Sequence, residues 1–343
     1  MAKIKVAVLM GGPSSEHEVS LKSGLNVIKN LDSKKYTALP IFIDKRGYWL
    51  FHGKHEQPLA EPEALLAMTR KGVNAALIAL HGEYGEDGGV QSALAAARIP
   101  FTGSASLPSA LAMHKVLAGK ILTQAGLRVP ESYEIIKSDW RKKPQEVLKN
   151  IYNSFGKQVV IKPANRGSSV GVSIVHILKN NLHPLEVAIE RAYSTSRHVV
   201  AQQFIKGREV TCGVLDVLGH AEALLPTEII PLGRSFFDYT AKYEGASKEI
   251  TPPAKMSLGL IHKIEKAALA AHKALGLKGV TRTDMIVVPV DKVYILEANT
   301  IPGLTEASLI PQQAKACGIS FPRLLDLMIQ DAVNILISNT KYI

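Results

Sequence analysis

Cysteine is scarce in this sequence. Cys212 and Cys317 are the only two among 343 residues, and neither belongs to a CxxC pair. A disulfide framework needs several cysteines in a short chain, and a zinc knuckle needs closely spaced pairs of ligands. Both kinds of cross-linked domain are therefore excluded. We expect two reduced and mostly buried thiols.

The sequence also lacks any long apolar run. A membrane-spanning helix needs about 20 consecutive apolar residues, and no segment comes near that length. The apolar stretch that follows the N-terminal lysines ends at Gly11 and Gly12 after about six residues, which is too short for a secretory signal. We therefore expect a cytoplasmic protein that does not contact a membrane.

Repeats, low-complexity tracts and dense basic runs are absent as well. The chain has 343 residues, 46% of them hydrophobic, so two or three packed units are expected instead of a single core. The net charge is +11, from 41 Lys and Arg against 30 Asp and Glu, and it is spread along the sequence. This distribution suits an anionic small molecule, or simply a soluble basic surface, better than a nucleic-acid track.

The first hundred residues alternate between strand-like and helix-like segments. Buried strands are predicted at 4–10, 37–43 and 75–80, and helices at 16–31 and 61–71. This βαβ order predicts a parallel sheet whose functional loops lie at the carboxyl ends of the strands.

The rest of the chain mixes shorter strands with helices. Helices are predicted at 108–125, 184–192, 261–275 and 321–337. Strands are predicted at 159–162, 171–175, 199–205 and 210–215, and a polar loop rich in aromatic residues is predicted at 234–249.

Two loops at the predicted strand ends carry ionisable side chains. In GGPSSEHEVS (11–20), Ser15 and Glu18 form the pattern of a capping box, and the helix N-terminus could receive an anion or simply be capped. No GxGxxG fingerprint is present. In ALHGEYGEDGGVQ (79–91), His81 directly follows a strand, and it could be a catalytic group or an ordinary loop histidine. The acidic residues that crowd this second loop are Glu83, Glu86 and Asp87.

The segment 282–301 predicts a hairpin. If 284–289 and 294–299 pair around a turn at Asp291 and Lys292, Asp284 faces Asn299. Directly opposed residues project to the same side of a sheet, and so do residues two apart on one strand. The side chains expected to share one face are therefore Arg282, Asp284, Glu297 and Asn299.

Two carboxylates and an amide oxygen on one face form a hard oxygen-ligand set. Such a set suits Mg²⁺, with phosphate oxygens and water completing the coordination. The alternative is a polar sheet face on which Arg282 is ion-paired to a carboxylate. A slip of one residue in the pairing would move Asp284 to the opposite side and destroy the site.

The segment VVIKPANRGSSVGVS (159–173) places two glycines and two serines between two predicted strands. Lys162 ends the first strand, and Pro163 cannot donate to a continuing ladder. Glycines expose backbone N–H groups without a Cβ in the way, so the loop could hold a phosphate, and Lys115 could reach the same anion. A plain hairpin rich in turn residues is the alternative. The order of residues is not that of a P-loop, because GxxxxGK[ST] does not occur.

Seven segments spread over nearly the whole chain carry one family's pattern in that family's order. They are GGPSSEHEVSLKSG, ALHGEYGEDGGVQ, GSASLPSALAMHK, VVIKPANRGSSVGVS, FDYTAKY, TRTD and LEANTIPGLTEASLIP. With these segments the chain resembles the D-alanine:D-alanine ligases, which have the ATP-grasp fold. Any one match is weak to moderate evidence, whereas their joint order is not expected by chance.

The resemblance implies an α/β fold of three parts. An N-terminal Rossmann-like parallel-sheet domain (1–103) would be followed by two α+β subdomains (104–200 and 201–343) that sandwich ATP. The last part would carry the metal site and a mobile loop at 234–249. The resemblance also implies a homodimer.

The implied reaction is the ATP-dependent joining of two D-alanine molecules for peptidoglycan precursor synthesis. ATP would phosphorylate the carboxylate of one D-alanine, and the amine of the second would attack the acyl phosphate. ATP and two Mg²⁺ or Mn²⁺ ions would be required. The rival interpretations are a related ligase with another acceptor such as D-lactate, a nucleotide sensor without turnover, and a nucleic-acid binder.

The resemblance also assigns residues to roles. The implied catalytic residues are Glu16, Ser168, Tyr243 and Arg282. The implied ATP-binding residues are Lys115, Lys162, Gly167, Ser168, Ser169, Gln202, Glu209 and Lys242. The implied substrate-binding residues are Glu16, Val19, Ser20, His81, Arg282, Gly303, Ser308 and Leu309. The implied metal ligands are Asp284, Glu297 and Asn299.

Three positions depart from the family's pattern. They are Ser92, His114 and Gln202. Gln202 stands where a carboxylate commonly helps to read the adenine amino group, so nucleotide preference stays open. A glutamine can still accept from an amino group through its carbonyl oxygen.

Overall fold

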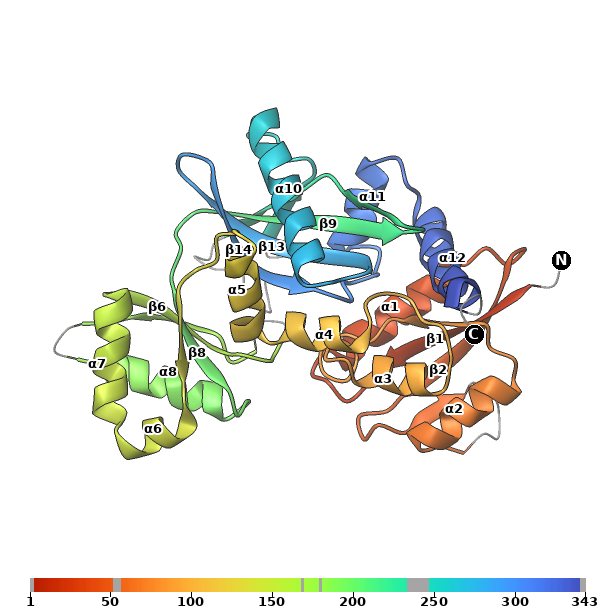
Figure 1. Cartoon of the computed structure of the whole chain (residues 1–343), viewed down its shortest axis with the longest axis horizontal. Coiled ribbons are helices and arrows are strands. Elements are labelled where there is room, and N and C mark those ends of the chain that lie inside the picture. Colours follow the sequence, from red (N-terminus) through yellow and green to blue (C-terminus); the bar gives the residue numbers. More distant parts are fainter. Residues whose placement is uncertain (1–2, 52–56, 168–169, 179–180, 233–246, 340–343) are drawn as a thin grey trace.

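The computed structural model describes residues 3–51, 57–167, 170–178, 181–232 and 247–339, with side chains described up to residue 334. In these residues the strands form three separate sheets, each packed against helices (Figure 1). Each sheet comes from one stretch of the chain, so the sheets follow one another along the sequence.

The N-terminal sheet has the strand order β3-β2-β1-β4. Its strands are β1 (Ile4–Gly11), β2 (Tyr36–Ile43), β3 (Trp49–Phe51) and β4 (Ala75–Ile78). The strand β1 pairs in parallel with both β2 and β4, whereas β3 is an antiparallel edge strand. The predicted parallel sheet is therefore confirmed.

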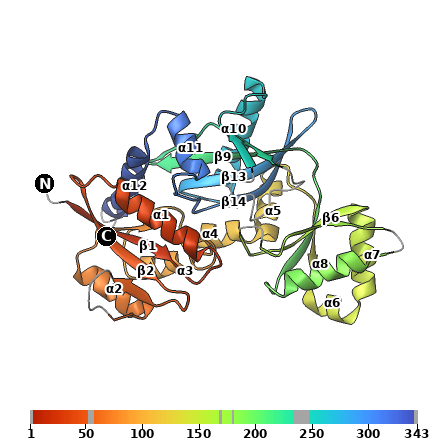
Figure 2. The same ribbon diagram turned by 180° about the vertical axis from the view of Figure 1, so that it is seen from behind.

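Helices cover both faces of this sheet. They are α1 (His17–Asn30), α2 (Glu61–Arg70) and α3 (Gly89–Ala96). The helix α1 lies on one face of the sheet, and α2 and α3 lie on the other (Figure 2). Val6 and Val8 of β1 pack towards α1, and Ala7 and Leu9 pack towards α2 and α3. The continuous apolar run of β1 is explained by this burial on both sides.

The start of α1 differs from the prediction. Glu16 is the N-cap residue, and no side chain caps the helix, so the expected capping box of Ser15 and Glu18 is wrong. Ser14 lies in the turn instead: its Oγ accepts from the N–H of Glu16 at 3.1 Å and donates to the carbonyl of His81 at 2.6 Å. These bonds tie the two N-terminal loops together.

Two helices replace the single helix predicted at 108–125. They are α4 (Ser106–Met113) and α5 (Lys115–Gln124). His114 separates them with an extended backbone (φ −89°, ψ 92°), and its side chain accepts from the N–H of Leu117 as the N-cap of α5. The prediction is wrong because the apolar periodicity continues through the break. The break places Lys115 at the first position of α5.

The middle sheet is antiparallel and has the order β5-β8-β6-β7. Its strands are β5 (Ser132–Ile135), β6 (Gln158–Pro163), β7 (Ser173–His176) and β8 (Val199–Gln203). The helices α6 (Lys137–Lys142), α7 (Pro144–Phe155) and α8 (His183–Tyr193) pack against one face of it. The middle sheet extends to Gln203, the last residue of β8. The expected boundary between the second and third parts of the chain, at residue 200, therefore lies inside this strand.

The third sheet has the order β12-β11-β9-β13-β14, and β10 pairs with β9 beside that path. Its strands are β9 (Arg208–Val217), β10 (His220–Ala223), β11 (Thr227–Pro231), β12 (Ser247–Ile250), β13 (Gly279–Val288) and β14 (Lys292–Asn299). The predicted polar loop ends earlier than expected, because residues 247–249 belong to β12. The rest of that loop lies outside the described residues.

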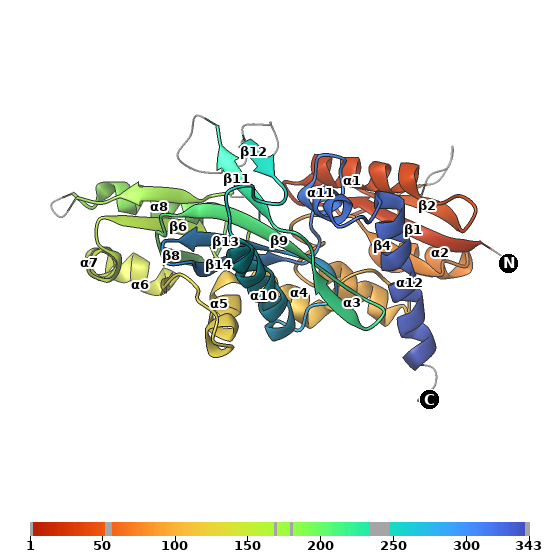
Figure 3. The same cartoon turned by 90° about the horizontal axis from the view of Figure 1, so that it is seen from above.

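Three helices accompany the third sheet. They are α10 (Leu258–Ala274), α11 (Leu309–Ala316) and α12 (Phe321–Asn339). The helix α10 packs on β9 and β13, whereas α12 lies beside the N-terminal sheet (Figure 3). Leu324 and Ile329 of α12 join the core formed by Val6 and Val8 of that sheet. The C-terminal helix therefore connects the first and third sheets. In the described part of the chain, no helix combines the length and the apolar character that crossing a membrane requires.

The two cysteines lie in different surroundings, and both are free thiols. Cys212 is buried on β9, and burial raises the pKa of its thiol. Cys317 follows α11 and is exposed, and its Sγ accepts from the N–H of Leu225 at 3.3 Å. The expectation of a buried thiol is therefore wrong for Cys317.

Candidate active site

The hairpin of β13 and β14 carries the predicted polar face, but its pairing differs from the prediction. Asp284 is opposite Glu297 and Arg282 is opposite Asn299, with a shift in register between Asp284 and Met285. The turn contains two residues with positive φ, Val290 and Asp291. The predicted pairing of Asp284 with Asn299 is wrong by two residues. Because side chains alternate with a period of two, an error of two still leaves Arg282, Asp284, Glu297 and Asn299 on one shared face.

Asp284 is the centre of this face. Arg282 donates to both of its carboxylate oxygens at 2.8 Å, Thr211 Oγ1 donates to Oδ1 at 2.7 Å, and Asn299 Nδ2 donates to Oδ2 at 3.1 Å. Beside it, Glu297 Oε2 lies 3.5 Å from Lys115 Nζ. The predicted shared face is confirmed, and each of its carboxylates lies next to a cationic side chain.

The donor set fits a hard divalent cation. Asp284 and Glu297 offer carboxylate oxygens, and Asn299 offers an amide oxygen, which are the ligand types that Mg²⁺ prefers. No group of three or more His, Cys, Asp or Glu side chains is arranged to hold a metal within the described ranges. A cation here would therefore need Asn299 and oxygens from outside the protein, such as phosphate and water, to complete its coordination.

Further polar side chains lie on neighbouring strands. Glu209 on β9 is two residues from Thr211, so it projects to the same side of the third sheet as Asp284. In the middle sheet, Val159 and Ile161 point into the core, which places Lys162 and Gln202 on the opposite face. Lys162 and Gln202 are only 7% and 8% exposed.

Lys115 links the middle sheet to the third sheet. Its backbone N–H donates to the carbonyl of Ala164, just after β6, at 2.8 Å. Its Nζ donates to the carbonyl of Arg166 at 2.5 Å and lies near Glu297. Lys115, the expected phosphate-binding lysine, therefore lies between the glycine-serine segment (159–173) and the face of the third sheet that carries Asp284, Glu297 and Asn299. We call this face the metal-type face.

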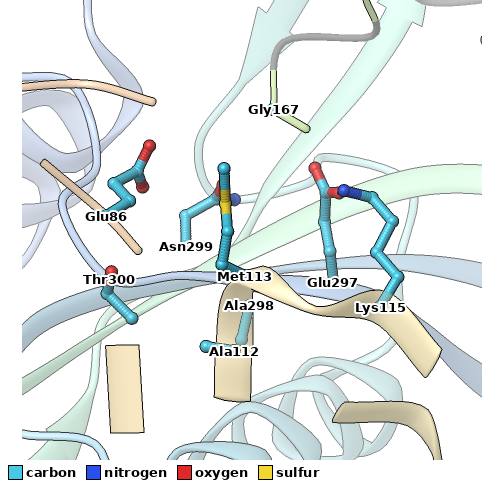
Figure 4. A pocket seen from close by; sticks show the side chains of 9 residues that line it. All are labelled: Glu86, Ala112, Met113, Lys115, Gly167, Glu297, Ala298, Asn299 and Thr300. Atoms are coloured by element: carbon cyan, nitrogen blue, oxygen red, sulfur yellow. The ribbon is translucent and has the colours of Figure 1, made fainter. Parts of the chain in front are cut away.

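These elements enclose a pocket (Figure 4). In that view, the side chains of Glu297 and Lys115 lie together at one end, Glu86 lies at the other, and Asn299 lies between them, with Gly167 above. The helical break at His114 and the register of β14 thus bring residues from four parts of the sequence to one cavity.

Glu16 lies where the N-terminal loops approach the glycine-serine segment. It is only 6% exposed. A Cβ added to Gly167 would lie 3.2 Å from Glu16 Oε2, and a Cβ added to Gly82 would lie 2.9 Å from the same oxygen. Glycine at both positions therefore leaves room for this carboxylate. Arg166, next to Gly167, forms an ion pair with Glu83 of the second loop.

His81 is buried, and both of its ring nitrogens have partners. Nδ1 lies 3.0 Å from the carbonyl of Ile301, and Nε2 lies 2.8 Å from Ser23 Oγ. A carbonyl can only accept, so Nδ1 carries the proton and Nε2 accepts from the serine hydroxyl. Burial lowers the pKa of His81. The backbone N–H of His81 also donates to Ser20 Oγ at 2.7 Å. Through its ring and its backbone, His81 therefore holds the chain at Ile301 against α1.

Glu86 is a site residue for which sequence analysis predicted no role. It accepts from the N–H of Gly82 at 2.7 Å and from the N–H of Ile301 at 3.4 Å. Burial, followed by the negative charge of Glu16, raises the pKa of Glu86 to about 8. The only signal in the sequence was the crowding of acidic residues in ALHGEYGED. Thr211 orients Asp284, and Ser23 orients His81. No motif or spacing in the sequence indicated either role.

The remaining expected residues fall into two groups. Gly303 and Ser308 are adjacent, since a Cβ added to Gly303 would lie 2.6 Å from Ser308 Oγ. Ser308 is the N-cap of α11 and Leu309 its first residue, while Val19 lies on α1. The expected residues that lie outside the described part of the chain are Ser168, Ser169, Lys242 and Tyr243.

The chain matches two models of known families. The model described as "D-ala D-ala ligase N-terminus" covers residues 5–104, and that described as "D-ala D-ala ligase C-terminus" covers residues 121–330. Curated relatives named D-alanine–D-alanine ligase include one from Syntrophobacter fumaroxidans, 41% identical over 96% of this chain and 98% of its own. Another from Clostridium beijerinckii is 38% identical over 97% of this chain and 99% of its own.

Solved structures agree with these matches. The D-alanine–D-alanine ligase from Bacillus anthracis superposes with a TM-score of 0.79 at 34% identity, over 98% of this chain and 99% of that one. A D-Ala:D-Ser ligase from Enterococcus faecalis gives a TM-score of 0.80 at 31% identity, over 96% of this chain and 99% of that one. The chain therefore belongs to the D-alanine:D-alanine ligase family and has its ATP-grasp fold.

Proposed function

We propose that the pocket between Glu86 and Lys115 is where this chain carries out the reaction of its family. As a member of that family, the chain uses ATP to ligate two D-alanine molecules into D-alanyl-D-alanine, for peptidoglycan precursor synthesis. The observation that supports this location is the convergence of Asp284, Glu297 and Asn299 with Lys115 on one face.

The chemistry explains why these groups belong together. A carboxylate resists attack by an amine, because the leaving group would be oxide; a phosphorylated carboxylate has a good leaving group. Two Mg²⁺ or Mn²⁺ ions, held by Asp284, Glu297 and Asn299, would neutralise phosphate charge and orient the transferred group. Lys115 and Lys162 would bind the phosphates of ATP as point charges.

The nucleotide would lie between the middle and third sheets. Gly167, with the neighbouring Ser168 and Ser169, would offer backbone N–H groups and hydroxyls to the phosphates. Lys242 would bind phosphate as well. Glu209 would hold the ribose, and Gln202 would read the adenine amino group through its carbonyl oxygen.

The amino-acid substrates would lie towards the N-terminal loops. Glu16 would bind the ammonium group of the first D-alanine, beside Val19 and Ser20 of α1. Arg282 and the backbone N–H at Gly303 would stabilise the charge of the tetrahedral intermediate.

The acceptor would be held by Ser308 and Leu309. His81 would act by holding Ile301, since both of its ring nitrogens already have partners. Tyr243 would join Ser168 and Glu16 in a hydrogen-bonded set that closes the site.

We also infer three features from the family resemblance. The chain would divide into an N-terminal unit (1–103), a central unit (104–200) and a C-terminal unit (201–343) that carries the metal site. It would act in the cytoplasm as a homodimer. Analytical ultracentrifugation measures the oligomeric state directly, and a monomer at working concentration would contradict the dimer.

The identity of the acceptor substrate distinguishes a D-alanine:D-alanine ligase from related ligases that use another acceptor. One of the similar solved structures is a D-Ala:D-Ser ligase, so the acceptor needs its own measurement. We expect D-alanine to be preferred over D-serine and D-lactate when all three compete, with products separated by mass spectrometry. Preference for D-serine or D-lactate would keep the reaction class and change the acceptor.

A coupled assay of ADP release, with and without D-alanine, tests the proposed function. We expect release that depends on D-alanine and on Mg²⁺, and a dipeptide product. ATP binding without D-alanine-dependent release would indicate a nucleotide sensor. Strongly salt-sensitive binding to DNA, without turnover, would indicate a nucleic-acid binder.

A further inference from the structure

Gln313 is a fully buried polar side chain on α11, and the reaction described above gives it no role. Its Oε1 accepts from the N–H of Gly213 at 2.8 Å. Its Nε2 donates to the carbonyl of Thr211 at 3.1 Å and to Thr227 Oγ1 at 3.0 Å. The side chain therefore bonds to two neighbouring strands, β9 and β11.

The chemistry of its partners fixes the orientation of the amide. The N–H of Gly213 can only donate and the carbonyl of Thr211 can only accept, so a flipped amide would oppose donor to donor and acceptor to acceptor. A buried polar side chain with all of its partners in place resists displacement, because any shift leaves buried groups unpaired.

Gln313 also fills a gap between two ladders of the third sheet. The pairing of β11 with β9 ends at Thr211, and the pairing of β10 with β9 begins at Val214. Gly213 lies between these ladders, and the side chain of Gln313 accepts its N–H there. A Cβ added to Gly213 would lie 2.6 Å from Ile310 Cδ1, so glycine is needed for α11 to approach this closely.

The same bonds connect α11 to the metal-type face. Thr211 accepts from Gln313 through its carbonyl and donates through Oγ1 to Asp284 Oδ1 at 2.7 Å. At the other end of α11, about one helical turn before Gln313, stand Ser308 and Leu309, and Ser308 Oγ accepts from the N–H of Thr305 at 3.0 Å. A continuous series of contacts thus runs from the start of α11 to Asp284.

We propose that Gln313 is a positioning residue, which anchors α11 on β9 and so sets the place of Ser308 and Leu309 relative to Asp284. The inference rests on the proposed assignment of the acceptor subsite to these two residues. Without the amide, the buried N–H of Gly213 would lose its acceptor and the carbonyl of Thr211 would lose the donor that Gln313 supplies. Water could reach them only if α11 moved away from the sheet, and that movement would carry the acceptor subsite with it.

The variant Gln313→Met tests this, because it keeps the length and burial of the side chain and removes its three hydrogen bonds. The dependence of rate on D-alanine separates the apparent KM of the first site from that of the second, and the ATP KM is measured in the same enzyme. We expect the second KM to rise about tenfold, as the loss of one to two net hydrogen bonds implies. The first KM and the ATP KM should stay within about twofold.

The matched control is His272→Met. His272 is also buried, at 1% exposure, and it bonds from α10 to Thr281 Oγ1 at 2.8 Å and Asp216 Oδ2 at 3.1 Å, at the other end of β9 and β13. We expect this control to lower Tm and leave the ratio of the two KM values unchanged. If Gln313→Met raised all three KM values equally, or lowered Tm alone, the positioning role would be overturned.

Two further variants keep the result interpretable. If Gln313→Met did not fold, Thr227→Val would remove one partner only, and we expect a smaller rise of the second KM; an unchanged value in that folded variant would overturn the proposal. Ser308→Ala tests the acceptor assignment independently. If Ser308→Ala left the second KM unchanged while D-alanine-dependent ADP release persisted, the acceptor assignment would fail, and the inference from Gln313 with it, while the reaction itself stood.

Discussion

The site has two acidic regions that differ in what stabilises their carboxyl groups. On the third sheet, Asp284 is bonded to Arg282 and Glu297 lies beside Lys115. In the N-terminal loops, Glu16 and Glu86 are both buried, beside a neutral His81. The sheet region balances its carboxylates with cationic side chains, and it has the oxygen donors to hold metal ions as well. In the loop region, by contrast, Glu86 keeps its proton up to a pKa of about 8.

This difference has a physical consequence for function. A carboxylate that keeps its charge can hold cations and phosphate-bound metals, whereas a buried neutral carboxyl can only hydrogen-bond. Removing charge should therefore be most damaging on the sheet and least damaging at Glu86, which is already neutral. Substitutions in the two regions test this contrast.

The largest effect is expected from Glu297→Gln. The change keeps the shape of the side chain and removes a carboxylate from the face, so we expect a folded protein whose turnover falls by about 100-fold or more. The binding of Mn²⁺ in the presence of nucleotide, followed by electron paramagnetic resonance, should weaken in parallel. A Glu146→Gln variant, altered in an exposed ion pair with Lys143, serves as control. A near-normal kcat of this variant at saturating Mg²⁺ would contradict the assignment of Glu297 as a metal ligand.

A smaller and more selective effect is expected from Lys162→Met. The lysine is 7% exposed on the face of the middle sheet that points away from its core. We expect the ATP KM to rise about tenfold or more, because a charge-assisted contact to phosphate is lost, and the D-alanine KM values to change less. Lys157→Met, in an exposed position just before β6, should change neither. Equal losses for ATP and D-alanine would indicate a structural role for the strand end.

The smallest effect on turnover, and the clearest dependence on pH, is expected from Glu86→Gln. In the folded protein this carboxyl stays protonated up to about pH 8, whereas in the unfolded chain it ionises near its ordinary pKa of 4.5. Its contribution to stability is therefore full below the unfolded pKa and is lost as pH rises towards 8. Glutamine is neutral throughout, so it avoids this loss.

The measurement is the free energy of unfolding of wild type and variant across pH. Relative to wild type, the free energy of unfolding of Glu86→Gln should gain at least about 1 kcal/mol between about pH 5 and about pH 8. Any bond to Gly82 or Ile301 that the amide cannot make adds an offset independent of pH. Glu222→Gln, on the exposed strand β10, should show no such gain. A constant difference across pH would show that Glu86 is ionised in the folded protein.

The sequence predicted much of the sheet side of the site. The alternation of side chains in the 282–301 segment placed Arg282, Asp284, Glu297 and Asn299 on one face, although the assumed turn was wrong. The error was tolerated because a shift of two residues preserves the side to which each residue points. The prediction of a single helix at 108–125 was wrong, because the apolar periodicity continues through the break at His114. That break positions Lys115.

What the sequence by itself determined are the family, through motifs in a fixed order, and the faces of regular strands, through their period of two. Only the tertiary structure decided the protonation of Glu86, the tautomer of His81 and the anchoring of α11 by Gln313. These depend on burial and on partners far away in sequence, such as Ile301 for His81 and Gly213 for Gln313. Strand alternation is a local property that short segments encode, whereas desolvation and hydrogen-bond partners are set by which distant segments the folded chain brings into contact.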